Sequence, residues 1–268
     1  MKKKHITPLL LVLFGLALFS GCSSQAKLSK GGVTLRLKPQ QGKTYTIITK
    51  SNTMNTMEVQ GQSMSMSQSM ETTQSFTAKE VTNNESTFET QIDAIKMTIS
   101  QMGMKLEYDS EHPEKTSPML AGQTKEIEEN LHKSESIKYD IQGHIVDSID
   151  ITKSQLDQVI NLLPEGNVSV GTLWVFDKTQ NISGNEITSQ NFYHVTAISE
   201  KSVDVRVSGH YEDAAKKEIG TFEGTASIDP KTGIVMNSNI KSNLSMTINE
   251  QGMSIPMTIV GNTTVDVK

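Results

Sequence analysis

A strict alternation of apolar and polar residues near the C-terminus constrains the fold of this chain more than any other feature. Over residues 234–248 the even positions are apolar except for two serines, and the odd positions over 237–247 are all polar. A period of two residues is typical of a β-strand with one buried and one solvated face. After a predicted turn at residues 249–252 the apolar residues occupy odd positions. The sequence therefore predicts a β-hairpin with one apolar face.

This hairpin also predicts an unusually large sheet. Pairing across the predicted turn aligns Ile248 with Met253 and Leu244 with Met257, so that both apolar stripes share a face. Pro256 falls on the other face, which indicates an edge strand or the start of a strand. A strand over residues 234–248 would span roughly 50 Å, whereas strands usually have about 5–6 residues. We therefore expect a mainly β protein with a long, curved antiparallel sheet or an incomplete barrel.

Two segments have helical rather than alternating periodicity, and both carry an apolar stripe that needs a partner. Pro164 follows the second segment and is a helix stop signal. We expect both helices to cover the concave face of the sheet. The stripes are Leu120, Thr124, Ile127 and Leu131 within residues 117–131, and Leu156, Val159, Ile160 and Leu163 within residues 152–163.

The stretch QGQSMSMSQSM, residues 60–70, places methionines at even positions and serines at odd positions. A tight turn at Gln60 and Gly61 would place Met57 opposite Met64 on the preceding strand. The apolar parity of the following strand flips near residues 94–95, which is the mark of a β-bulge. With that bulge, Met70 lies next to Met97.

These methionines allow three interpretations. Methionine fills irregular cores, and it also forms adaptable apolar surfaces that accept varied ligands. Soft thioether sulfurs can bind Cu(I), but no histidine or cysteine lies nearby to tighten such a site. Plain core packing and an apolar ligand groove are therefore both favoured over a copper site. The candidate ligand-lining residues are Met57, Met64, Met66, Met70, Met97, Met236, Met246, Met253 and Met257.

The N-terminal sequence MKKKHITPLLLVLFGLALFSGCSS has a basic end, an apolar run over residues 9–19 and then small residues. This layout is typical of a signal peptide, and the apolar run is shorter than the ~20 residues that span a bilayer. The stretch LFSGC, residues 18–22, resembles the lipobox of bacterial lipoproteins. The resemblance implies cleavage before Cys22 and attachment there of acyl chains such as palmitate, which would anchor the protein to a membrane. Cys22 is the only cysteine, so no disulfide can form within the chain.

The predicted organisation is a signal peptide at residues 1–21, a flexible tether at 22–32 and a single β-rich domain at 33–268. A weak internal similarity leaves open two related halves, 33–163 and 164–268. In this similarity the strand opening Gly42-Lys-Thr-Tyr corresponds to Gly171-Thr-Leu-Trp.

Three segments together resemble an uncharacterised family of bacterial envelope lipoproteins. They are the PQQGKTY stretch at residues 39–45, the GQSMSM hairpin at 61–66 and LPEGNVSVGTLW at 163–174. The resemblance would cover most of the β-rich domain, and its motifs are turn glycines, strand-opening aromatics and methionine-rich hairpins. It implies no catalytic residue. The expected shape is also similar to the incomplete barrels with helical lids of periplasmic lipoprotein carriers, which does not establish a function.

Charge and motifs exclude several classes of protein. Removal of the signal peptide takes three of the 25 basic residues, leaving 22 against 30 acidic ones and a formal charge of −8. This charge argues against a nucleic-acid partner. A nucleophile elbow, a P-loop and a dinucleotide fingerprint are all absent from the sequence. The histidines are scattered and show no metal-ligand spacing, so we expect no catalytic residue, cofactor or metal site. Those outside the predicted signal peptide are His112, His132, His144, His194 and His210.

The sequence thus predicts a lipid-anchored, non-catalytic protein of the bacterial envelope. We expect its concave methionine and isoleucine face to bind an apolar ligand or a lipid. The alternative is a structural or interaction protein of an envelope assembly without a ligand pocket. Ser23 after Cys22 favours the periplasmic face of the outer membrane if the bacterium has two membranes, and otherwise the outer face of the plasma membrane.

Overall fold

The computed structural model describes residues 32–59, 61–120, 124–148, 159–160, 163–182, 185–250 and 253–268. The predicted signal peptide, Cys22 and most of the tether lie outside these residues. Within them, twelve strands form one antiparallel sheet, and two short strands, β1 (Val33–Thr34) and β8 (Asn167–Val168), pair separately. The twelve strands are β2 (Thr44–Val59), β3 (Gln62–Val81), β4 (Glu85–Gln101), β5 (Met104–Asp109), β6 (Ser134–Asp140), β7 (Ile145–Ser148), β9 (Leu173–Ile182), β10 (Asn185–Ile198), β11 (Val203–Asp213), β12 (Glu218–Ile228), β13 (Val235–Glu250) and β14 (Met253–Val267).

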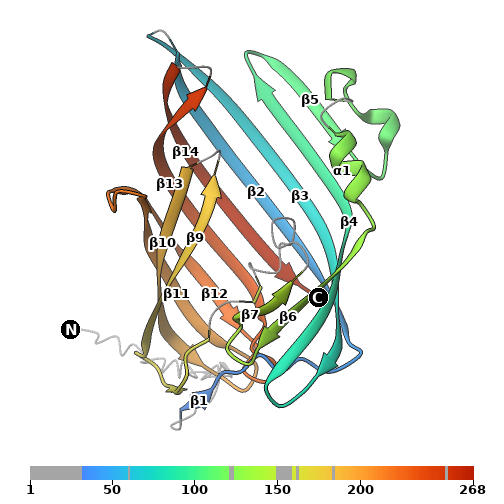
Figure 1. Cartoon of the computed structure of the whole chain (residues 1–268), viewed down its shortest axis with the longest axis vertical. Coiled ribbons are helices and arrows are strands. Elements are labelled where there is room, and N and C mark those ends of the chain that lie inside the picture. The colour runs from blue at the N-terminus through green and yellow to red at the C-terminus, as the bar shows by residue number, and fades with distance from the viewer. Residues whose placement is uncertain are drawn as a thin grey trace, which may run out of the picture.

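The sheet is long, curved and open. Its strand order is β7-β6-β4-β3-β2-β14-β13-β12-β11-β10-β9, and β5 pairs with the part of β4 that β6 leaves free. In Figure 1 the wall of β2, β3, β13 and β14 lies behind, β9 and β10 stand at the left, and β6 and β7 lie low in front. β7 and β9 are the two ends of the sheet and do not pair with each other, so the predicted curved antiparallel sheet, not closed into a barrel, is confirmed.

Two register predictions on the N-terminal side are confirmed. Met57 pairs with Met64 across the turn between β2 and β3, and Met70 pairs with Met97 across β3 and β4. The β3–β4 register shifts where Thr73 pairs with Ala94 and Gln74 with Ile92. This is the bulge that the parity change in β4 predicts, since one extra residue moves every later side chain to the other face.

The register predicted for the C-terminal hairpin is wrong by two residues. In the structure Ile248 pairs with Ile255 and Met246 with Met257, so the turn is shorter than the sequence suggests. The two apolar stripes still share a face, because a shift of two residues conserves the side-chain parity. Pro256 lies just beyond Met257, where the ladder between β14 and β2 ends, so its missing N–H breaks no bond to β2.

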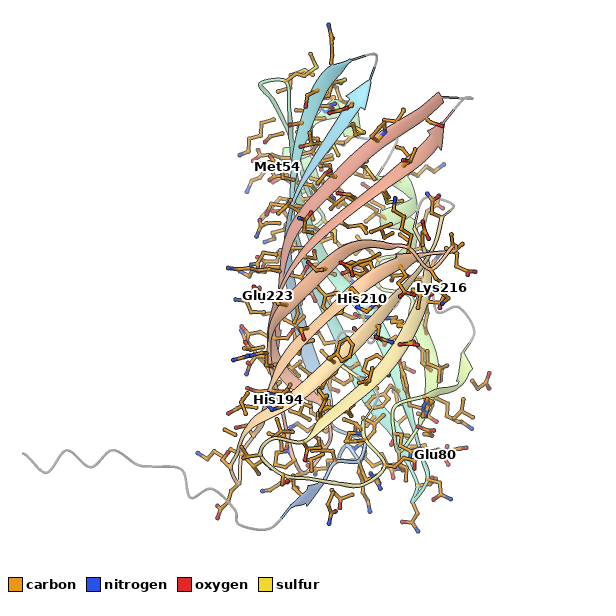
Figure 2. All side chains as sticks on the ribbon, turned by 90° about the vertical axis from the view of Figure 1, so that its left-hand side faces the viewer. Met54, Glu80, His194, His210, Lys216 and Glu223 are labelled. Carbon is orange, nitrogen blue, oxygen red and sulfur yellow. The ribbon has the colours of Figure 1, made fainter. Side chains whose placement is uncertain are left out.

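Burial alternates along much of the long strands and defines two faces. On β2, Tyr45, Ile47 and Thr49 are buried, whereas Lys50 and Asn52 are exposed. We call the face that carries the buried residues the inner face and the opposite one the outer face. Met54 and Glu223 project from the outer face (Figure 2).

The core occupies one end of the inner face, which we call the core end. Leu35 and Leu37, from the segment that leads into β2, are almost fully buried there and pack with residues from both halves of the sheet. Four aromatic rings cross four adjacent strands, with ring centroids 4.9 Å apart for Tyr45–Phe76, 5.5 Å for Phe76–Phe88 and 6.0 Å for Phe88–Tyr139. The opposite end carries the turns β2–β3 and β13–β14, and we call it the hairpin end.

Among the described residues, the α-helix in the first predicted segment is shorter than expected. Within the first predicted segment, one α-helix, α1 (Lys125–Asn130), follows a 3₁₀ turn at Pro118–Leu120, and these elements lie beside β5 (Figure 1). Leu120 and Thr124 of the predicted stripe are buried, while Ile127 and Leu131 are half-buried. Most of the second predicted helix lies outside the described residues. Its described members Val159, Ile160 and Leu163 are buried in the core, as expected for an apolar stripe.

Candidate functional site: the apolar inner face

The predicted methionines come together on the inner face at the hairpin end. Met246, Met257, Met57 and Met64 are successive cross-strand partners on β13, β14, β2 and β3. This register makes a row of thioether side chains across four strands. Adjacent strands lie about 4.8 Å apart, so neighbouring members of the row are within reach of each other.

Three more of the predicted residues extend this surface along β3 and β4. Met66, Met70 and Met97 lie on the same face and are half-buried, and Gln68 Nε2 lies 3.5 Å from Met97 Sδ. Isoleucines of β13 and β14 border the row, with Ile248, Met257 and Ile259 packed beside a small cluster of Ile187, Leu244 and Met246. We call the inner surface around Met57, Met64, Met66, Met70, Met97, Met246 and Met257 the methionine surface; all of these residues except the buried Met246 are half-buried.

The two remaining predicted residues do not join this surface in the described structure. Met236 packs against the main core at the opposite end of β13. Met253 begins β14 and pairs with Glu250, and its side chain lies outside the described residues. The copper hypothesis for Met64, Met66 and Met70 stays a prediction, because their shared face is equally what an apolar surface requires.

Two cavities adjoin the inner face toward the core end. One has a volume of about 260 Å³ and the other of about 430 Å³, and both are lined by Lys178, Asn191 and Tyr193. The larger cavity also contacts Tyr139 and Ile145, so it lies between the two free ends of the sheet. A concave, mostly apolar space with a few polar groups is the usual form of a small-molecule site.

Aromatic rings make the walls of these cavities apolar. Tyr193 stacks between Trp174 and Phe176, with ring centroids 5.1 and 5.4 Å away. Tyr211 and Phe222 line the smaller cavity, with their rings 5.1 Å apart. Burial raises the pKa of Tyr193 well above its ordinary value of 10.0, and burial also raises the pKa of Tyr211. Both shifts mark an environment that disfavours charge.

Polar groups of the cavities serve the fold. Asn191 Nδ2 donates to the carbonyl oxygens of Phe176 and Ser189, which ties β10 to β9. His144 lines the larger cavity, and its Nδ1 lies 2.8 Å from Asp140 Oδ2. Burial acts to raise the pKa of Asp140, but hydrogen bonds from the backbone N–H groups of His144 and Gln142 and from the His144 ring hold it below 3.8. This arrangement is typical of a turn stabilised by a carboxylate.

Across the described part of the chain, no three or more His, Cys, Asp or Glu side chains group closely enough to hold a metal ion. None of the helices in the same residues is both long and apolar enough to cross a bilayer. The sequence did not single out Phe176, Tyr193 and Phe222 as cavity-lining residues. The alternation Trp174-x-Phe176 was the available signal, since both rings had to share a face.

Comparisons with known proteins give distant structural likenesses only. No family model matches the chain, and no curated protein matches its sequence. Lipovitellin, from a study of its lipid–protein interactions, has a TM-score of 0.46 and 11% identity, over 85% of this chain and 25% of that one. This chain therefore spans about a quarter of the lipovitellin chain.

Two bacterial structures are also similar over most of the chain. The translocator domain of the autotransporter NalP from Neisseria meningitidis has a TM-score of 0.33 and 9% identity, over 84% of this chain and 88% of that one. A putative outer membrane lipoprotein-sorting protein domain from Vibrio parahaemolyticus has a TM-score of 0.19 and 6% identity, over 83% of this chain and 84% of that one.

Proposed function

We propose that this protein is a non-catalytic, lipid-anchored protein of the bacterial envelope that holds an acyl chain on the inner face of its open sheet. The observation that carries the proposal is the methionine surface, which continues the inner face beyond the main core and, apart from the buried Met246, stays only half-buried. An apolar surface of this kind needs a cover in water, because exposed apolar area costs about 25 cal/mol per Å². An acyl chain supplies that cover.

The dimensions suit a single acyl chain. Met64 and Met70 lie six residues apart on β3, which corresponds to roughly 20 Å along the strand. One acyl chain spans about half of the ~30 Å hydrocarbon core of a bilayer, or about 15 Å. Burial of each CH₂ group contributes about 0.8 kcal/mol, and flexible methionine side chains can adapt to chains of different length. The predicted anchor at Cys22 would hold the protein at a membrane, which is a source of acyl chains.

A photoreactive fatty acid tests this function. The full chain in lipid nanodiscs is irradiated with a palmitate analogue that carries a diazirine near its methyl end, and the adducts are mapped by mass spectrometry. We expect adducts on peptides that contain Met57, Met64 and Met66. Adducts confined to the N-terminal tether, which lies at the bilayer in any case, would refute the proposal.

Two neighbouring residues provide a matched pair of variants. Met64 faces the inner side and Ser65 the outer side of the same strand. Met64→Lys places an ammonium group against the acyl chain and should reduce inner-face labelling several-fold, whereas Ser65→Lys should leave it unchanged. Equal labelling of the two variants would show that the methionine surface is not the site. Matching circular dichroism spectra confirm that both variants are folded.

A second function, docking of an envelope protein at a sheet edge, is favoured by a different observation. Among the described strands β9 pairs only with β10, and its outward side chains Leu173 and Val175 are 57% and 46% exposed. Unpaired strand edges with exposed apolar residues are common docking sites for another chain. A photo-crosslinking amino acid at Val175, compared in cells with one at the exposed outer-face residue Asn237, should then capture one specific protein. No adduct beyond the Asn237 background would contradict this function.

A further inference from the structure

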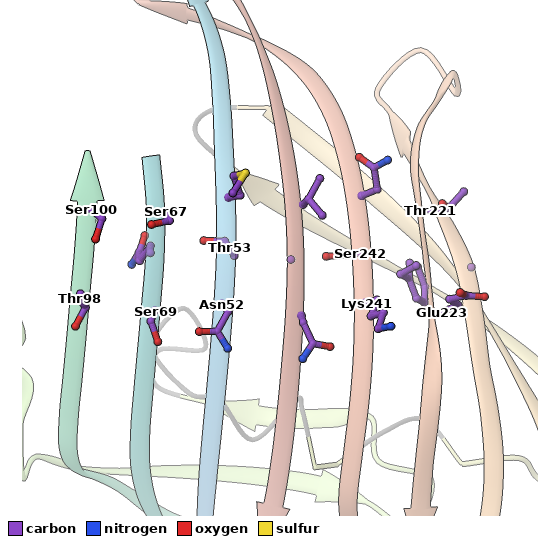
Figure 3. A pocket seen from close by; sticks show the side chains of 18 of the residues that line it. Asn52, Thr53, Ser67, Ser69, Thr98, Ser100, Thr221, Glu223, Lys241 and Ser242 are labelled. Atoms are coloured by element: carbon purple, nitrogen blue, oxygen red, sulfur yellow. The ribbon is translucent and has the colours of Figure 1, made fainter. Parts of the chain in front are cut away.

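A hollow larger than either inner cavity lies on the outer face, which the acyl-chain proposal does not use. It is a trough of about 990 Å³ that crosses β4, β3, β2, β14, β13, β12 and β11. Figure 3 views it from outside, with these seven strands side by side. Its long direction runs across the strands, over roughly 29 Å at about 4.8 Å per strand.

The register of the paired strands places the side chains that line the trough in two parallel rows. The first row consists of cross-strand partners with hydroxyl, carboxamide or charged side chains. The second row, two residues further along each strand, contains Ser67, Met54, Val260 and Asn243 in succession. Gly261 lies between the rows and contributes no side chain. The first row is Ser69, Asn52, Asn262, Lys241, Glu223 and Ser208.

Most of the exposed lining of the trough is apolar, hydroxyl and carboxamide groups are set into it, and it carries no net charge. Lys241 and Glu223, the two charged residues of its lining, are direct cross-strand partners, so each offsets the other. Such a surface lacks the excess of positive charge that a phosphate-rich or polyanionic ligand requires. Hydroxyl and carboxamide groups both donate and accept hydrogen bonds, which suits a neutral ligand with many hydroxyl groups.

An apolar patch sits in the middle of these polar groups. Met54 and Val260 are cross-strand partners and are 55% and 51% exposed. The pair is flanked by Asn52, Asn262 and Asn243 on the same face. A pyranose ring has the same division, with an apolar C–H face and a rim of hydroxyl groups. A ring lying over Met54 and Val260 would point its hydroxyls toward the flanking carboxamides.

Asn262 provides an independent observation. Its Oδ1 is shielded from solvent and has no hydrogen-bond partner among the described residues, although the side chain lines the trough. A shielded polar atom without a partner costs about 1–3 kcal/mol, so it needs an explanation. Rotation about the Cβ–Cγ bond would turn the carboxamide toward a ligand hydroxyl in the trough.

We propose that the outer trough binds a neutral oligosaccharide that lies across the strands. Polar groups recur at the strand spacing of about 4.8 Å, which is close to the length of one pyranose unit, so the trough accommodates about five or six units. This site uses the face opposite the methionine surface and does not depend on the acyl-chain proposal. The protein would then hold a lipid on one face and an envelope glycan on the other.

Methionine methyl NMR distinguishes the two faces. The full chain, labelled with ¹³C at its methionine methyl groups, is studied in phosphocholine micelles, because this detergent has no sugar headgroup. Maltohexaose and chitohexaose are the neutral probes, and hexagalacturonate is the anionic probe. We expect a neutral probe to shift the Met54 resonance in a saturable way, while the Met57 and Met64 resonances of the opposite face stay in place. Met54→Leu assigns the Met54 resonance.

A blocking variant and a matched control complete the test. Val260→Arg fills the centre of the trough and should weaken binding at least about tenfold. Asn237→Arg adds the same side chain to the same face outside the trough and should leave affinity unchanged. Unshifted inner-face methionine resonances show that both variants are folded.

Three outcomes would overturn the proposal. The first is no response of Met54 to either neutral probe at millimolar concentration. The second is equal binding of hexagalacturonate, or binding that Val260→Arg leaves intact. The third is self-association of the protein that Val260→Arg abolishes, seen by sedimentation in the absence of sugar, which would assign this face to a contact between copies of the chain.

Discussion

The aromatic ladder of the core end gives a quantitative test of the inner and outer faces. Phe76 is fully buried, and its ring lies 4.9 Å from that of Tyr45 and 5.5 Å from that of Phe88. Phe76→Leu keeps an apolar side chain but removes two ring pairs, each worth about 0.5–1.5 kcal/mol. The lost volume adds a cavity cost, so we expect a loss of roughly 2–4 kcal/mol in the free energy of unfolding.

Phe192 provides the matched control, because it carries the same side chain on the outer face of β10. Its ring contacts His210 at a centroid distance of 6.2 Å and is not part of the core. Phe192→Leu should cost less than about 1 kcal/mol. Urea unfolding of the full chain, followed by the fluorescence of Trp174, the single tryptophan, measures both. With a slope of about 3 kcal/mol per M, Phe76→Leu should lower the midpoint by about 1 M. Equal midpoints for the two variants would refute the assignment of the faces.

Three further predictions concern strand packing and pH. Gly209→Ala should lower the melting temperature by about 4–8 °C relative to Ser208→Ala, because a Cβ at Gly209 would lie 2.3 Å from Phe222 Cζ; an unchanged melting temperature would contradict this packing. The lowered pKa of Asp140 stabilises the fold above pH 3.8, and this stabilisation is lost as pH falls through the folded-state pKa. In this acidic range the urea midpoint of Asp140→Asn should therefore depend less on pH than that of the parent protein. The raised pKa of Tyr193 stabilises the fold below pH 10.0 and the effect is lost as pH rises further, so Tyr193→Phe should lose less stability in alkali than the parent; identical alkaline profiles would count against burial of this hydroxyl.

Much of the fold was predictable because the period of a strand is two. Parity along β2, β3, β13 and β14 assigned each methionine to a face, and the parity change in β4 located the bulge. Parity cannot distinguish registers that differ by two residues, which is why the C-terminal hairpin was predicted with a shift of that size. The length of the first helix was also overestimated, since an apolar stripe at helical spacing can be buried by a 3₁₀ turn and an α-helix of only six residues, as at Leu120 and Thr124.

The sequence by itself therefore determined that the chain forms long amphipathic strands, and which side chains lie together on each. The tertiary structure decided what those faces meet. The pairing of β2 with β14 joins segments from the two ends of the β-rich domain, and no local pattern encodes such a contact. That pairing aligns Met57 with Met257 on the inner face and Met54 with Val260 on the outer face. The methionine surface and the outer trough both arise from it, because each needs side chains of distant strands at matched heights.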